Sequence, residues 1–306
     1  MLYIAIAAAL ILSLSFICYY IVFFSPHKGD GDFHKLPEGE QYEKHSVRML
    51  QLIDELLEIP YEAVKVISYD GKELSGRFYQ IDKNAGVDIY FHGYRGSGVR
   101  DFCGGARLGM ELGRNVLLVD QRAHGNSQGR SICFGLKERF DCLSWINYVL
   151  CRFGEDTDIN LYGVSMGGAS VLMASALDLP ENVRHIVADS PYDSAADIIK
   201  KVCGDRKLPA ALVYPFISLG ALLFAGIRLD SMSCSKAVRQ AKIPILIIHG
   251  EDDRFVPCQM SENIRKANPS LVTRVTFPKA GHGISYIEDK LRYRALVSEF
   301  VKIPQD

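Results

Sequence analysis

GVSMG at residues 163–167 decides the fold of this chain, because it is a Gly-x-Ser-x-Gly motif between two segments of different character. Residues 158–164 (DINLYGV) form a short apolar run that predicts a buried strand, whereas residues 168–177 (GASVLMASAL) are small and helix-favouring. Ser165 is therefore expected on a sharp strand-to-helix turn with its hydroxyl exposed. The flanking glycines are needed there because side chains would crowd such a turn.

Two later loops each follow a predicted strand and carry ionisable side chains. The buried-strand run at residues 243–248 (IPILII) leads into HGEDD at 249–253, and the strand candidate at 272–277 leads into PKAGHG at 278–283. A serine on such a turn needs an acid and then a histidine downstream, each in a loop after a late strand. Both loops are present in the required order.

A third loop completes a resemblance to a known family. Residues 87–91 (VDIYF) predict a strand that ends in His-Gly-Tyr at 92–94. Over roughly residues 61–303 the chain resembles the α/β-hydrolase superfamily, in the branch of esterases, lipases and acyl hydrolases. The resemblance implies an α/β fold, with a mostly parallel sheet and helices on both faces.

The resemblance also implies a Ser-His-Asp triad. Ser165 would be the nucleophile, His282 its general base, and Asp253 the acid that holds the imidazole in the productive tautomer. Asp252 is adjacent and has the same charge, and Asp253 is preferred because it takes the position of the aspartate in His-Gly-x-x-Asp. Asp189, at the end of an earlier strand, is a further alternative, for which a structural role is the simpler interpretation.

The oxyanion of the tetrahedral intermediate would be stabilised by two backbone N–H groups. The resemblance assigns these donors to Tyr94 and Met166, and it leaves His92 a structural role in shaping the loop. DQRAHGNS at residues 120–127 is similar to the family's Asp-x-Arg-Gly-x-Gly-x-Ser loop, with Ala123 at a usual glycine position. This departure affects the local turn and none of the catalytic roles.

Strands and helices alternate along the rest of the chain, which favours a parallel sheet covered on both faces. A hairpin is expected from residues 64–68 and 74–80, and further strands at residues 116–119 and 183–188. A helix is expected at residues 136–153 with an apolar face of Leu136, Phe140, Leu143, Ile146, Leu150 and Phe153, and with Trp145 as a packing residue.

The N-terminal segment predicts a membrane anchor. Residues 2–24 contain no charged side chain and are long enough to cross a bilayer as a helix. A cleaved signal peptide is the alternative, but a basic leader and a small-residue cleavage site are missing, and Ile17 before Cys18 argues against a lipoprotein signal. Lys28 and Lys35 lie on the distal side, which favours a single-pass protein with its catalytic domain in the cytoplasm.

Two segments flank or interrupt the expected domain. Residues 25–60 are predicted as a polar linker followed by an amphipathic helix at residues 42–59, which Pro60 ends. Residues 191–242 are predicted as a cap insertion. Its centre, residues 208–227, has no charge, but a second membrane crossing there would separate Ser165 from the two later loops. We therefore expect a lid, broken at Pro215, that covers the site.

Composition excludes several other classes of function. The net charge of −1 offers no electrostatic surface for nucleic acid. The eight cysteines include no C-x-x-C pair or Cys/His ligand cluster, so no metal site is expected, and unpaired thiols suit a reducing compartment. No Gly-rich nucleotide motif occurs, so no cofactor is expected.

The sequence thus predicts a membrane-anchored serine hydrolase of carboxylic esters or thioesters with lipophilic acyl groups. Two alternatives remain open. A peptidase of the same fold would need an acidic cap residue for the substrate amine, for which the candidates are Asp193, Asp197, Asp205 and Asp230. A non-catalytic scaffold on the same fold is the other, and the intact set of triad residues weighs against it.

Overall fold

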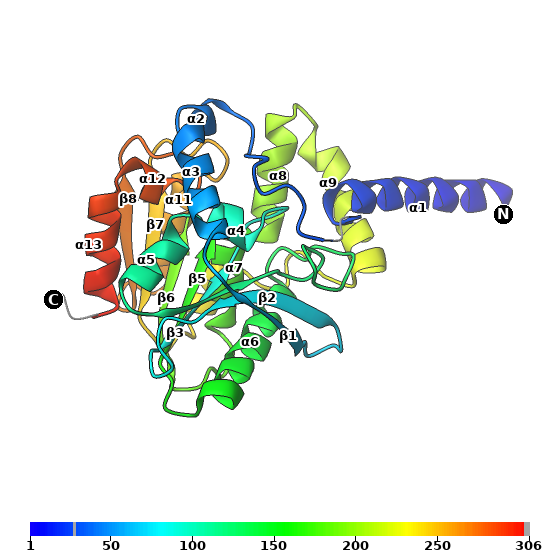
Figure 1. Cartoon of the computed structure of the whole chain (residues 1–306). Coiled ribbons are helices and arrows are strands. Elements are labelled where there is room, and N and C mark those ends of the chain that lie inside the picture. The colour runs from blue at the N-terminus through cyan, green and yellow to red at the C-terminus, as the bar shows by residue number, and fades with distance from the viewer. Residues whose placement is uncertain (27–28, 303–306) are drawn as a thin grey trace.

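A single mixed sheet forms the centre of the molecule in the computed structural model, which describes residues 1–26 and 29–302 (Figure 1). Its strand order is β1-β2-β4-β3-β5-β6-β7-β8; β2 pairs antiparallel with β1 and β4, and the other neighbours are parallel. The strands are β1 Glu62–Ile67, β2 Glu73–Tyr79, β3 Val87–Phe91, β4 Asn115–Val119, β5 Ile159–Val164, β6 Val183–Asp189, β7 Ile245–Gly250 and β8 Val272–Phe277. The predicted α/β-hydrolase fold is confirmed, including the antiparallel hairpin at its start.

Helices cover both faces of this sheet, as expected from the alternation of elements. Alternate residues of the buried strands point into two separate apolar clusters, one packed against α6 and α7 and the other against α3, α5 and α13. The helices that follow strands are α4 Gly98–Asp101, α5 Gly105–Glu111, α6 Glu138–Phe153, α7 Met166–Ala174, α11 Cys258–Ala267, α12 Ser285–Glu288 and α13 Lys290–Phe300.

The buried face of α6 agrees with the predicted one only in part. Ile146 of the expected stripe and the packing residue Trp145 are buried as predicted, but the helix also turns Glu138 and Asp141 inward. The Glu138 carboxylate accepts hydrogen bonds from the backbone N–H groups of Cys133 and Gly135, at 2.7 and 2.9 Å. Hydrophobic periodicity missed these two carboxylates because it assigns charged residues to the solvent side of a helix. A carboxylate can be buried when hydrogen-bond partners replace water.

The N-terminal helix α1 (Leu2–Val22) projects from the body, yet its last turn belongs to the domain core (Figure 1). Phe23 is fully buried, and the Tyr19 hydroxyl shares a 2.8 Å hydrogen bond with the hydroxyl of Ser131. Among the described residues, α1 is the one helix long and apolar enough to cross a membrane. Lys28, used above for orientation, lies outside the described residues.

The segment after α1 folds back over the domain. It contains α2 (Glu40–Glu43) and α3 (Ser46–Leu57), and α3 buries its predicted apolar stripe against α5 and the sheet. Residues 191–242 form α8 (Ala195–Asp205), α9 (Ala210–Gly220), the π-helix η1 (Ala221–Ala225) and α10 (Cys234–Val238) between β6 and β7. The break expected at Pro215 is absent, because α9 continues through this proline, which lies on an exposed side of the helix.

Candidate active site

Ser165 lies at the turn between β5 and α7 with a left-handed backbone conformation, φ 54° and ψ −115°. The two glycines of the motif are sterically required. A Cβ on Gly163 would collide with the backbone of Gly167 and Gly168, and a Cβ on Gly167 would collide with the carbonyl of Phe91. The turn strains the backbone of Ser165 and projects its side chain at the end of the parallel strands.

His282 and Asp253 are brought together by the loops that follow β8 and β7. The His282 Nδ1 and Asp253 Oδ2 atoms lie 2.7 Å apart. The other carboxylate oxygen, Asp253 Oδ1, accepts hydrogen bonds from the backbone N–H groups of Phe255 and Val256 at 2.9 and 2.8 Å. The neighbouring Asp252 is exposed and lies outside this arrangement.

The environment keeps Asp253 ionised. Burial would raise the pKa of this carboxyl, but the charge of His282 and hydrogen bonds from His249 and His282 outweigh that effect and hold the pKa below its usual range. The alternative acid behaves differently, because burial raises the pKa of Asp189 to about 6. Asp189 accepts a 2.9 Å hydrogen bond from the hydroxyl of Ser190.

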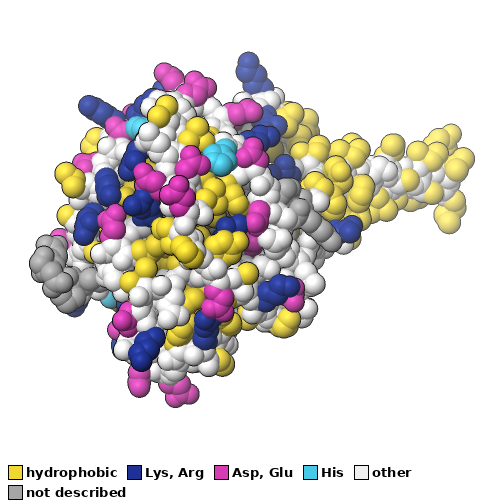
Figure 2. Space-filling model, viewed as in Figure 1, with side chains coloured by type: hydrophobic (Ala, Val, Ile, Leu, Met, Phe, Trp, Pro, Cys, Tyr) yellow, Lys and Arg dark blue, Asp and Glu magenta, His cyan; other side chains and the backbone are white. Residues whose placement is uncertain are grey.

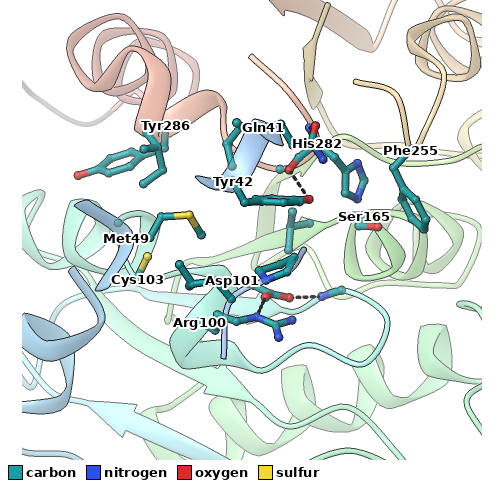
Figure 3. A pocket seen from close by; sticks show the side chains of 18 of the residues that line it. Gln41, Tyr42, Met49, Arg100, Asp101, Cys103, Ser165, Phe255, His282 and Tyr286 are labelled. Atoms are coloured by element: carbon teal, nitrogen blue, oxygen red, sulfur yellow. Dashed lines mark hydrogen bonds and ion pairs between the residues drawn. The ribbon is translucent and has the colours of Figure 1, made fainter. Parts of the chain in front are cut away.

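Ser165 and His282 both line a cavity of about 660 Å³. Their side chains face each other in Figure 3, and Phe255 packs against the histidine ring with a centroid distance of 5.1 Å. Ser165 is 6% exposed and His282 9%, so the cavity is the route by which solvent or substrate reaches them. No hydrogen bond joins them among the described atoms, and contacts of this kind often tighten only when substrate binds.

The loop after β3 lies on the other side of Ser165. The backbone N–H of Gly93 donates a 2.8 Å hydrogen bond to Asp101 Oδ2, and Asp101 Oδ1 accepts one of 2.9 Å from Arg100 Nε. Within the part of the chain that the structure describes, the backbone N–H groups of Tyr94 and Met166 donate to no protein acceptor. These are the two groups that the resemblance implies as oxyanion donors.

His92 is fully buried behind this loop. Its Nδ1 lies 2.8 Å from the carbonyl oxygen of Gly93, and its Nε2 accepts a 3.1 Å hydrogen bond from the backbone N–H of Gln121. Burial lowers the pKa of His92, so the ring stays neutral and supports the loop through these two contacts. Ala123, at the family's usual glycine position, adopts a left-handed φ of 64°, so this turn tolerates a Cβ.

The N-terminal segment forms a wall of the cavity that sequence reasoning missed. Residues 35–38, Gln41, Tyr42 and Met49 line it together with Ser165 and His282. The Gln41 side-chain oxygen accepts a 3.0 Å hydrogen bond from the backbone N–H of His282, and the Tyr42 hydroxyl donates one of 3.1 Å to the His282 carbonyl. No local pattern could have revealed contacts between residues about 240 positions apart.

The apolar run at residues 208–227 does not line this cavity, so the prediction that it forms a lid over Ser165 is wrong. That run packs against α1 instead, where the two apolar helices bury apolar surface against each other. None of the four aspartates expected to bind a peptide amine lines the cavity either. Among residues 1–26 and 29–302, no cluster of three or more His, Cys, Asp or Glu side chains could hold a metal ion.

Comparison with known proteins agrees with this architecture. The profile of the family described as "alpha/beta hydrolase fold" matches residues 89–210. The YqkD protein of Bacillus subtilis is 24% identical over 195 residues, which cover 63% of this chain and 64% of that protein. The thiohydrolase aneE of Aspergillus aculeatus is 29% identical over 157 residues, or 48% of this chain and 49% of that protein. The chain thus spans less than two thirds of these curated relatives.

A solved structure extends the likeness to most of the chain. The esterase Pf2001 of Pyrococcus furiosus superposes with a TM-score of 0.63 and 25% sequence identity, over 81% of this chain and 92% of that one. The structural match therefore extends well beyond the segment that the family profile covers.

Proposed function

The chain belongs to the α/β-hydrolase superfamily, and on that premise we propose that it is a serine hydrolase with Ser165, His282 and Asp253 as its catalytic triad. The observation that carries the proposal is the 2.7 Å contact between His282 Nδ1 and Asp253 Oδ2, with His282 lining the same cavity as Ser165 at its strained turn. The carboxylate fixes the proton on Nδ1, so Nε2 is free to act as the base.

The reaction follows from these positions. Ser165 Oγ attacks the acyl carbonyl carbon while His282 Nε2 takes the hydroxyl proton, and the backbone N–H groups of Tyr94 and Met166 stabilise the oxyanion that forms. The imidazolium then protonates the leaving alcohol or thiol, which departs and leaves an acyl ester on Ser165. Water, deprotonated by His282, releases the acid and restores the enzyme.

The cavity favours lipophilic acyl groups of carboxylic esters or thioesters. Met49, Cys103 and Tyr286, all nearly fully buried, line the end of the cavity away from Ser165 (Figure 3). Apolar walls of this kind stabilise an acyl chain by about 0.8 kcal/mol for each methylene that leaves water. The esterase and the thiohydrolase among the similar proteins act on these two classes of bond, by their names.

We also propose that α1 anchors the enzyme in a membrane as a single span. Its 21 residues have a mean hydropathy of 2.3 in the most apolar window, which suits a bilayer-crossing helix. Lys28 and Lys35 follow it closely in the sequence, and lysines near this end of the span favour the cytoplasmic side for the catalytic domain.

A fluorophosphonate probe tests the proposed chemistry. The wild-type protein in detergent should be labelled and should hydrolyse p-nitrophenyl esters, whereas Ser165→Ala should lose labelling and about 10⁶ in kcat. Ser270→Ala, at an exposed serine away from the cavity, is the matched control and should behave as wild type. Labelling of Ser165→Ala at the wild-type rate would refute the assignment of the nucleophile.

A further inference from the structure

A patch of exposed apolar side chains lies beside the base of α1. It consists of Leu212 on α9 and Leu222, Leu223 and Phe224 on η1, which are 68%, 49%, 49% and 40% exposed. Residues 208–227 contain no charged side chain. Several large apolar side chains exposed on adjoining helices indicate a surface that is covered by a partner.

The patch is continuous with α1. A Cβ on Gly220 would collide with the backbone carbonyl of Ser15, so the two helices touch backbone to backbone, and Ser15 is fully buried there. The Phe224 ring lies 5.2 Å from Phe16 and 5.4 Å from Tyr19, between ring centroids. In Figure 2 the hydrophobic surface of α1 continues onto the body at the base of the helix.

The length of α1, compared with the thickness of a bilayer, indicates that lipid covers this patch. At about 1.5 Å per residue, its 21 residues extend over about 30 Å, which is the thickness of the hydrocarbon core. Ser15, where α9 approaches α1 most closely, lies about 10 Å before the end of α1, and residues 2–14 are all exposed. If the body stayed outside the bilayer, only residues 2–14 could lie within it, and these extend over about 20 Å, which is too short for a crossing.

We propose that α9 and η1 are immersed in the lipid bilayer beside α1, so that the apolar patch contacts acyl chains and glycerol groups of the near leaflet. This inference rests on the proposed role of α1 as an anchor. An immersion of about 5–10 Å matches both the position of the Ser15 contact and the usual depth of interfacial helices. The exposed cations that flank the run, Arg206, Lys207 and Arg228, then lie at the level of the phosphate groups.

This immersion brings the cavity to the membrane surface. Arg95 lines the cavity, and its guanidinium donates hydrogen bonds of 3.0 and 3.3 Å to the carbonyls of Ile21 and Phe24 at the end of α1. A lipophilic ester dissolved in the leaflet therefore has a short route to Ser165 that does not cross bulk water.

Site-directed fluorescence on the full chain in vesicles tests the proposal. Trp145 is the sole tryptophan of the sequence and is fully buried, so the wild-type emission is a constant background. Leu223→Trp places a reporter in the patch. Leu291→Trp is the matched control, because Leu291 is 80% exposed on α13, on the opposite side of the body from α1 (Figure 1).

The vesicles contain equal parts of phosphatidylcholine and phosphatidylglycerol, with some of the phosphatidylcholine spin-labelled on the acyl chain near the headgroup. We expect Leu223→Trp to lose at least about twice the fraction of its added emission that Leu291→Trp loses. Equal losses, in protein that resists alkaline extraction from the vesicles, would overturn the immersion and leave the anchor intact. Blue-shifted but unquenched added emission from Leu223→Trp would also overturn it, and would show that protein, such as a second copy of the chain, covers the patch.

Two further measurements distinguish failure of the immersion from failure of the anchor or of the catalytic assignment. Release of the wild-type protein by alkaline extraction would reject the anchor and the immersion together. Fluorophosphonate labelling of the same vesicles reports on Ser165 alone, so loss of labelling would reject the catalytic assignment without changing the quenching result.

Discussion

The Tyr94 hydroxyl donates a 2.8 Å hydrogen bond to the backbone carbonyl of Val22, the last residue of α1. The last carbonyls of a helix have no partner within it, and here Tyr94 and Arg95 supply partners for Val22 and Ile21. Since the backbone N–H of Tyr94 is also the proposed oxyanion donor, the end of the N-terminal helix supports one edge of the catalytic site.

Tyr94→Phe should therefore reduce kcat by about three- to tenfold with little change in KM. The substitution keeps the aromatic ring and the backbone donor but removes a hydrogen bond whose net contribution is about 0.5–1.5 kcal/mol. The expected loss is specific to the transition state, because the oxyanion exists only there. Steady-state kinetics with a short p-nitrophenyl ester in detergent would measure it.

Tyr19→Phe is the control for this effect. It removes a 2.8 Å hydrogen bond between the same end of α1 and Ser131, which is not among the residues that line the cavity. It should lower the melting temperature about as much as Tyr94→Phe while leaving kcat unchanged. Equal kinetic losses in the two variants would mean that α1 stabilises the domain in general and not the oxyanion loop.

Asp253→Asn should lower kcat by about 10⁴, whereas Asp252→Asn should leave it near the wild-type value. An asparagine at position 253 can present an N–H to His282, which disfavours the tautomer that leaves Nε2 free as a base. The exposed Asp252 carboxylate makes no contact with the imidazole. Measuring kcat of both variants on the same ester would show which aspartate contributes more. A larger loss for Asp252→Asn would reverse the assignment.

Asp189→Asn should raise stability at high pH and keep activity. Because burial raises the pKa of Asp189 to about 6, ionising it in the folded protein is unfavourable by up to about 3 kcal/mol relative to the unfolded chain. This cost is present above pH 6, decreases as the pH falls, and is absent below the unfolded pKa near 4. The variant should therefore unfold at higher urea than wild type at pH 8 and at similar urea below pH 4.

The same variant distinguishes a structural from a catalytic role for Asp189. Asparagine can still accept the hydrogen bond from Ser190 through its side-chain oxygen. A fall in kcat comparable with that of Asp253→Asn would make Asp189 part of the catalytic machinery.

Met49→Ala should reduce hydrolysis of long-chain esters more than hydrolysis of acetate esters. Met49 is 6% exposed and lines the apolar end of the cavity, so its removal leaves the distal methylenes of a long chain without a contact. One lost methylene contact corresponds to about fourfold in kcat/KM. The ratio of kcat/KM for decanoate and acetate esters is the measurement, and Leu291→Ala, at an exposed position that does not line the cavity, is the control. An unchanged ratio would place the acyl group elsewhere.

The sheet and the positions of the three loops that carry Ser165, Asp253 and His282 could be predicted because each depends on local sequence. Buried parallel strands such as β5 and β7 appear as short apolar runs, and the turn at Ser165 demands glycines at fixed offsets. Asp253 could be separated from Asp252 only through the resemblance, since both have the same charge and differ by one position.

The errors occurred where distant partners decide the structure. Hydrophobic periodicity leaves Asp141 outside the buried face of α6, but Arg122 forms hydrogen bonds of 2.6 Å to both of its carboxylate oxygens and draws it into the interior. The apolar run at residues 208–227 lies against α1 rather than over Ser165. A single sequence does not indicate which of two apolar surfaces such a run will cover.

The hydrogen bond between Gln41 and the His282 backbone has a consequence for how the enzyme is made. The two residues are separated by 241 positions, and a ribosome adds about 5–20 residues per second, so they emerge on the order of ten to fifty seconds apart. During that interval α1 is available for insertion while His282 has not yet been synthesised. The nascent chain lacks its proposed catalytic base throughout this interval, so the proposed activity can begin only after α1 has had that time in which to insert.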